Sequence, residues 1–228
     1  MTTVRRSVEQ TVSRLVRRTV RERAQLVGLP NARTDAFAAL ASLLDYTPPD
    51  LDALHVATLC AEALRYGFGC VVVPLGDVAA CADYLGGSGV RVGVKIASMA
   101  ELDVALHAGA SEIEIAPTPE TIRNDQQFAA WLGDLRGRGD NHFILKLDLT
   151  DPTFAPDALL RTCARIGSLA VDVVALPAAL IADLERTLSP DMAIKVNSIT
   201  TLTEARQALA AGASRLGTSH ALALMASL

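Results

Sequence analysis

The sequence predicts a single (β/α)8 barrel, also called a TIM barrel, and three observations support this fold class. Short apolar strands alternate with helical patterns from about residue 40 onward. At 228 residues, half of them hydrophobic, the chain is long enough for one such barrel. An internal repeat is the third observation, because RVGVKIASMAELDVALHAGASEIEI resembles DMAIKVNSITTLTEARQALAAGASRLGT.

The two repeated segments each contain a lysine on a strand, then a helix, then AGAS before the next strand. Counting strands along the chain makes them the third-to-fourth and seventh-to-eighth units, which lie half a barrel apart. Self-similarity at this distance is expected of a closed eight-stranded architecture. The main alternative is an open doubly wound sheet, but no GxGxxG or GxxxxGK[ST] motif follows any strand.

Eight strands are expected because each is a short run of aliphatic and β-branched residues, such as GCVVV or FILKLDL. Helix starts are also marked: Pro and Asp in TPPD open the first helix, Ser98 and Glu101 form a capping box for the third, and Pro177 begins the sixth. The fourth and fifth gaps are longer, with polar loops expected at NDQQ, RGRGDN and DLTDPTFAPD. The expected strands are residues 41–46, 69–73, 91–97, 111–116, 143–149, 171–176, 192–197 and 214–218.

The N-terminal residues 1–34 form a helical extension in this prediction, and residues 35–228 form the barrel domain. Valines and leucines recur near helical spacing among the arginines of VRRSVEQTVSRLVRRTVRERAQLVG. We expect an amphipathic helix that packs on the barrel or across the interface of a homodimer. A basic helix on a membrane surface is the alternative, although the apolar face is weak and lacks aromatic residues.

Composition excludes several classes of partner. The net charge of −4 argues against binding to nucleic acid. No apolar stretch approaches the roughly 20 residues of a membrane span, and the N-terminus lacks the apolar core of a secretory signal. We therefore expect a cytoplasmic protein with no membrane partner. The four cysteines and four histidines show no metal-binding spacing, so neither a metal nor another cofactor is expected.

The lysines are the most informative residues, because the chain has only three against eighteen arginines. Lys95, Lys146 and Lys195 lie within apolar runs on the third, fifth and seventh strands, and Asp45 lies on the first. Inward side chains of one layer in such a barrel come from alternate strands, so these four residues should meet near the carboxyl-terminal mouth. A buried ammonium group is costly, so it is normally paired or has a lowered pKa.

Side-chain alternation adds further polar groups to the interior of the barrel. Lys146 and Asp148 share one face of the fifth strand, and Lys195 and Asn197 share one face of the seventh. The fourth strand has Glu112 and Glu114 on a single face.

The chain resembles deoxyribose-phosphate aldolase, a class I aldolase, from about residue 40 to residue 228. The resemblance is carried, in order, by LLDYT, AGASEIEI, ILKLDL, AIKVN and AGASRLGTS. It implies active-site positions for Asp45, Thr47, Lys146 and Lys195. It also implies a role in proton transfer for Glu114, and a phosphate-contacting loop containing Gly217 and Ser219.

Two departures from the family pattern change the expected chemistry. The sixth strand of the family contains the lysine that forms the Schiff base, whereas the matching segment here, VDVVALPAAL, has Ala175 at that position. The Gly-Gly phosphate turn after the seventh strand is replaced by Asn197 and Ser198. Ordinary deoxyribose-phosphate cleavage is therefore not expected, because alanine cannot form an imine.

These observations predict a divergent aldolase-type lyase that acts on a small carbonyl or sugar-phosphate-like substrate. We favour Lys195 as the nucleophile, with Lys146 in an ion pair, Lys95 lowering the pKa of its neighbour, and Glu114 or Asp45 moving the proton. One alternative is a non-covalent acid/base isomerase or cyclase. Another is a non-catalytic protein that binds a small anion, in which Lys146 pairs with Asp45 or Asp148 and Lys95 pairs with a glutamate. The expected substrate contacts are Thr47, Asp148, Asn197, Ser198, Gly217, Ser219 and His220, the last of which could instead cap the final helix.

Overall fold

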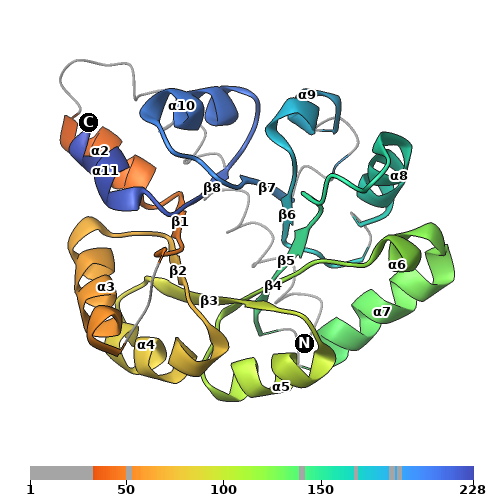
Figure 1. Cartoon of the computed structure of the whole chain (residues 1–228), viewed down its shortest axis with the longest axis horizontal. Coiled ribbons are helices and arrows are strands. Elements are labelled where there is room, and N and C mark those ends of the chain that lie inside the picture. The colour runs from red at the N-terminus through yellow and green to blue at the C-terminus, as the bar shows by residue number, and fades with distance from the viewer. Residues whose placement is uncertain (1–32, 50–52, 139–141, 167–168, 185–187, 189–191) are drawn as a thin grey trace, which may run out of the picture.

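The protein is a closed barrel of eight parallel strands, as the sequence predicts (Figure 1). The computed structural model describes residues 33–49, 53–138, 142–166, 169–184, 188 and 192–228. Each strand pairs with the next along the chain, and the first pairs with the last. The strands are β1 (Leu44–Tyr46), β2 (Cys70–Val72), β3 (Arg91–Ile96), β4 (Glu112–Ile115), β5 (Ile144–Asp148), β6 (Val173–Ala175), β7 (Ala193–Val196) and β8 (Arg215–Thr218). All eight lie within the predicted ranges.

Helices surround the barrel in Figure 1. The chain enters the first strand from α2, and the eighth strand leads into α11. Short 3-10 turns, η1 (Leu75–Asp77) and η2 (Ala178–Leu180), precede two of the helices. The helices are α2 (Arg33–Ala41), α3 (Ala53–Tyr66), α4 (Val78–Leu85), α5 (Met99–His107), α6 (Pro119–Arg123), α7 (Asp125–Gly137), α8 (Pro156–Ile166), α9 (Ile181–Leu184), α10 (Leu202–Ala210) and α11 (Ala221–Ala226).

Local signals explain where several helices begin. The Ser98 hydroxyl accepts a hydrogen bond from the backbone N–H of Glu101, as expected for the start of α5. The expected polar loop at NDQQ is wrong, because Asn124 is instead the N-cap of α7 and accepts hydrogen bonds from two backbone N–H groups of its first turn. Asparagine is a strong N-cap residue, so this segment starts a helix inside the long fourth gap.

Alternation on the strands separates two environments. On β5, the side chains of Leu145 and Leu147 are fully buried in the apolar core, whereas Lys146 between them contacts carboxylates. The apolar side chains therefore pack between strands and helices, which leaves the other face of the strands for polar residues.

The predicted helical extension, residues 1–34, lies almost wholly outside the described residues, so its packing remains a prediction. Among the residues that the structure describes, every helix is too short or too polar to span a bilayer.

Candidate active site

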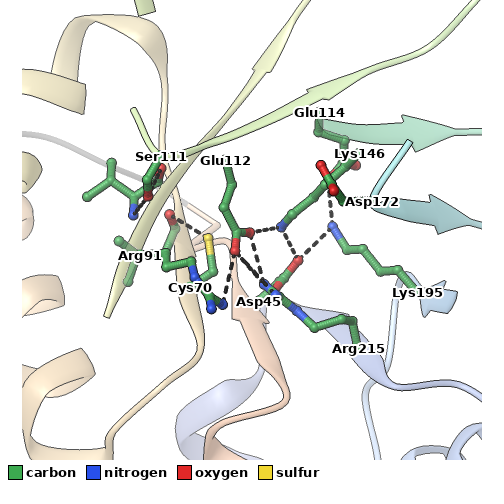
Figure 2. A network of polar contacts seen from close by, with 12 residues as sticks. Asp45, Cys70, Arg91, Ser111, Glu112, Glu114, Lys146, Asp172, Lys195 and Arg215 are labelled. Atoms are coloured by element: carbon green, nitrogen blue, oxygen red, sulfur yellow. Dashed lines mark hydrogen bonds and ion pairs between the residues drawn. The ribbon is translucent and has the colours of Figure 1, made fainter. Parts of the chain in front are cut away.

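The interior of the barrel contains six buried ionisable side chains from five strands, shown in Figure 2. Three are carboxylates and three are cations, so their formal charges cancel. Each has at most 9% of its surface exposed. They are Asp45 on β1, Glu112 and Glu114 on β4, Lys146 on β5, Lys195 on β7 and Arg215 on β8.

Asp45 lies at the centre of this charged cluster. Its Oδ2 atom is 2.5 Å from Nζ of Lys146 and 3.2 Å from Nζ of Lys195. Its Oδ1 atom accepts hydrogen bonds from Nε of Arg215, at 2.9 Å, and from Nη2 of the same side chain. Burial alone would raise the pKa of Asp45, but the charges of Arg215, Lys146 and Lys195 lower it well below its usual range. Asp45 is therefore ionised and holds both lysines.

Glu112 extends the charged cluster toward the amino-terminal end of the barrel, where β3 begins. Its carboxylate contacts Lys146 and lies 2.9 Å from Nη2 of Arg215. Arg91, the first residue of β3, approaches it to 3.3 Å with a half-exposed side chain. Burial opposes ionisation of Glu112, but Lys146 and Arg215 lower its pKa.

Glu114 connects the buried cluster to the mouth. Its Oε2 atom is 2.5 Å from Nζ of Lys195, and its Oε1 atom is 2.8 Å from Nζ of Lys95. The second contact is an ion pair without hydrogen-bond geometry, so Oε1 accepts no hydrogen bond from any described residue. Burial opposes ionisation, but Lys195 and Lys95 lower the pKa of Glu114 to about 2. Glu114 is thus an ionised carboxylate that is paired with Lys195 through one oxygen and with Lys95 through the other.

Lys95 differs from the expectation of a buried amine. Its side chain is 54% exposed, and its Nζ atom also lies 3.3 Å from Oδ2 of Asp148. The other oxygen of Asp148 accepts hydrogen bonds from the backbone N–H and the hydroxyl of Thr150, which fix the carboxylate. Lys95 is the penultimate residue of β3, and so reaches the solvent-facing end of the barrel.

Two of the three lysines have raised pKa values because they are paired with carboxylates, and for Lys146 this agrees with the ion pair expected from the sequence. Burial lowers the pKa of Lys146, but Asp45 and Glu112 outweigh burial and raise it. The pKa of Lys95 is likewise raised by Glu114 and Asp148 in spite of partial burial. Carboxylates match the cations in number, so each of these two amines is stabilised in its charged form.

Other predicted contacts surround β7 and β8. A Cβ atom on Gly217 would lie 2.3 Å from Oδ1 of Asn197 and 3.0 Å from Cε of Lys195, so both side chains use the space left by this glycine. Ser198 has a φ of 61°, in the left-handed region that favours glycine. A glycine-type turn therefore persists here with a side chain on it.

The remaining predicted contacts are exposed. The Ser219 hydroxyl lies 3.0 Å from Nδ1 of His220. His220 occupies the position before α11, although its side chain makes no capping hydrogen bond. The backbone N–H of Thr47 donates to the carbonyl of Thr218, which keeps the end of β1 beside β8.

Arg215 is the residue that sequence reasoning missed. Alternation could have identified it, because it lies two residues before Gly217 on the same strand. Its residue type did not suggest a buried site residue, because most of the eighteen arginines lie in helical or loop patterns typical of surfaces.

Three potential metal ligands lie close together in the cluster, but their surroundings do not suit a metal cation. Ligand atoms of Asp45, Cys70 and Glu112 lie within 4.8 Å of one another. Both carboxylates are already neutralised by Lys146 and Arg215. Burial raises the pKa of the Cys70 thiol well above its usual value, so the thiolate that a metal needs is disfavoured.

Comparison with known proteins relates the chain to an aldolase. No protein-family model matches the sequence. The chain is 27% identical to deoxyribose-phosphate aldolase 1 of Cutibacterium acnes over 215 residues, which cover 82% of this chain and 97% of that protein. The chain is therefore similar to a deoxyribose-phosphate aldolase over most of its length.

Solved structures show the same fold. The tetrameric deoxyribose phosphate aldolase from Aeropyrum pernix has a TM-score of 0.72 at 20% identity, covering 92% of this chain and 97% of that one. Dihydrodipicolinate synthase from Bacillus clausii has a TM-score of 0.57 at 16% identity, covering 79% of this chain and 69% of that one.

The departure on the sixth strand is visible in the aldolase-like barrel. Ala175 is fully buried, and its register partners are Asp148 on β5 and Lys195 on β7. A methyl group therefore stands between Asp148 and Lys195 at the position where the resemblance implies the Schiff-base lysine.

Proposed function

We propose that the chain is a carbon–carbon lyase of the aldolase type that uses Lys195 as its amine nucleophile. The observation that carries this proposal is the 2.5 Å contact between Nζ of Lys195 and Oε2 of Glu114, whose other oxygen is directed toward Lys95. An amine beside an ionised carboxylate supplies both the nucleophile and the base that such a reaction needs.

The contacts of the three lysines favour Lys195 over the other two. Lys146 pairs with two carboxylates deep in the barrel, and its raised pKa keeps it protonated at neutral pH. Lys95 is exposed and also has a raised pKa. Lys195 is the lysine that lies between Asp45 and Glu114, and Glu114 connects it to Lys95 at the mouth of the barrel.

In the proposed reaction, the Lys195 ammonium passes a proton to Glu114, and the resulting amine adds to a substrate carbonyl. Glu114 returns this proton as one water leaves, which gives an iminium ion and an ionised carboxylate. Glu114 then removes the proton from the β-hydroxyl group as the carbon–carbon bond breaks. The bonding electrons form an enamine, and the hydroxyl-bearing fragment leaves as an aldehyde. Glu114 returns the proton to the enamine carbon, and addition of water to this iminium ion releases the second carbonyl product and restores the Lys195 ammonium.

The expected substrate is a small carbonyl compound with altered or absent recognition of a phosphate. A phosphate site typically uses backbone N–H groups that a glycine turn leaves open. Here Asn197 occupies the space beside Gly217, and Ser198 adds a side chain to the turn. Both features favour compounds that rely on the amine and carboxylates rather than on phosphate.

Borohydride trapping tests this proposal. The protein is incubated with acetaldehyde and sodium borohydride, and the adduct is detected by intact mass and located by peptide mapping. Three lysines in the whole chain make the assignment unambiguous. We expect an adduct at Lys195 that is lost in Lys195→Met and in Lys195→Arg, because arginine keeps the charge without a nucleophilic amine.

Two results would contradict this assignment. An adduct at Lys95 alone would show that the nucleophile is the lysine at the mouth of the barrel. Turnover of a substrate by the Lys195→Met variant at the wild-type rate would favour the non-covalent acid/base alternative.

A further inference from the structure

Arg215 makes the most extensive contacts with the buried carboxylates. Its Nε atom donates to Oδ1 of Asp45 at 2.9 Å, and its Nη2 atom donates to the same oxygen. The Nη1 and Nη2 atoms also donate to Glu112, at 3.2 and 2.9 Å. One planar guanidinium, only 9% exposed, therefore bridges carboxylates from β1 and β4 (Figure 2).

This bridge determines what the two buried lysines can contact. Because Arg215 fills Oδ1 of Asp45, Lys146 and Lys195 both contact the remaining oxygen, Oδ2. Lys146 is the nearer, at 2.5 Å against 3.2 Å for Lys195. The shorter contact of Lys195 is to Glu114 instead.

We propose that Arg215 is a positioning residue that keeps the Lys195 amine at Glu114 by occupying Oδ1 of Asp45. Without the guanidinium, Oδ1 becomes available, and Lys195 moves away from Glu114 and closer to Asp45, which it already contacts through Oδ2. Lysine does not reproduce this arrangement, because one ammonium group lacks the planar fork from which Arg215 donates two hydrogen bonds to Oδ1 of Asp45 and further bonds to both oxygens of Glu112. The predicted effect on catalysis rests on the proposed function, whereas the predicted position of the Lys195 amine does not.

The test uses the small number of lysines. Labelling with [ζ-15N]lysine gives three side-chain resonances, assigned by substituting each lysine in turn. Arg215→Met should change the chemical shift of the Lys195 resonance and its dependence on pH. Arg215→Lys should do the same, and the fourth resonance that it adds is assigned by comparison with Arg215→Met. Displacement of a reacting group by about 1 Å can reduce a rate about 100-fold, so trapping of acetaldehyde at Lys195 should slow by about that factor.

Arg136→Met is the matched control. Arg136 on α7 is also a buried arginine, bound to Asp172 and to the backbone carbonyls of Phe143 and Ala170, and it contacts none of the six residues of the charged cluster in the described hydrogen bonds and ion pairs. It should lower thermal stability without altering the Lys195 resonance or the trapping rate. A merely structural role for Arg215 predicts that the two Met variants behave alike.

The outcomes separate the two proposals. Absence of trapping in the wild-type protein would refute the proposed nucleophile, and the Lys195 resonance would still decide the role of Arg215. An unchanged Lys195 resonance in Arg215→Lys would overturn that role. If Arg215→Met does not fold, Arg215→Lys and the charge-balanced double variant Arg215→Met/Glu112→Gln provide the same comparison.

Discussion

Replacing Glu114 by glutamine should destabilise the protein by about 3 kcal/mol at neutral pH and by far less in acid. The magnitude follows from the pKa of Glu114, which falls from 4.5 to about 2 on folding, at about 1.4 kcal/mol for each unit. Little solvent screening reduces this value, because the side chain is only 3% exposed. Glutamine keeps the shape of the side chain and removes the charge that Lys195 and Lys95 contact.

The sign of the pH dependence is fixed by the direction of the shift. A carboxylate with a lowered pKa stabilises the folded state above its unfolded pKa, and that stabilisation is lost as the pH falls through the folded value. The difference between wild type and Glu114→Gln should therefore be full above about pH 5. It should fall to about 1 kcal/mol near pH 3, and vanish below about pH 2.

Urea unfolding followed by circular dichroism measures this difference at each pH. Using the difference between two proteins cancels the titration of the other carboxylates. Glu120→Gln is the control, because Glu120 is exposed on α6 and should change stability by less than about 0.5 kcal/mol. A Glu114→Gln effect below about 1 kcal/mol at pH 7, or one that does not vary with pH, would refute the reasoning.

Three further predictions concern the mouth, the N-terminus and the thiols. Gly217→Ala should displace Asn197 and Lys195 and slow acetaldehyde trapping about tenfold or more, whereas Gly133→Ala, where a Cβ meets nothing within 4 Å, should leave trapping unchanged. Removal of residues 1–34 should lower the melting temperature or reduce the oligomer mass measured by light scattering. If neither quantity changes, the segment stabilises neither the fold nor an oligomer. The four buried free cysteines should react with Ellman's reagent only after unfolding, and fast reaction of the native protein would contradict their placement.

The fold could be predicted from the sequence because a barrel strand has a strong local signature. Each strand is a short apolar run, and the helices between them repeat the same order of signals. The repeat around Lys95 and Lys195 fixed the strand count, which placed the lysines on alternate strands. The strands are shorter than expected at their ends, because pairing in a closed barrel involves only three to six residues of each run.

The ion pairs could be predicted only in part, because they depend on side-chain reach across the barrel. Of the two partners expected for Lys146, the structure has Asp45 rather than Asp148, and it adds Glu112. Lys95 was expected among the buried amines, but its place near the end of β3 takes it to solvent. The spacing of residues along a strand predicts the face on which a side chain lies, but it says little about how deep in the barrel that side chain lies.

The charged interior is itself the strongest physical argument for a function. Such barrels are usually filled by layers of bulky aliphatic side chains. Replacing buried ion pairs by apolar residues of similar volume is often neutral or stabilising, by about 1–4 kcal/mol. Six paired ionisable groups are therefore a poor means of stabilising a barrel, and desolvation opposes every one of them. Stability is therefore a weak explanation for the cluster, which favours a role in binding or reaction. The contacts from Lys195 through Glu114 to Lys95 connect the cluster to the mouth of the barrel.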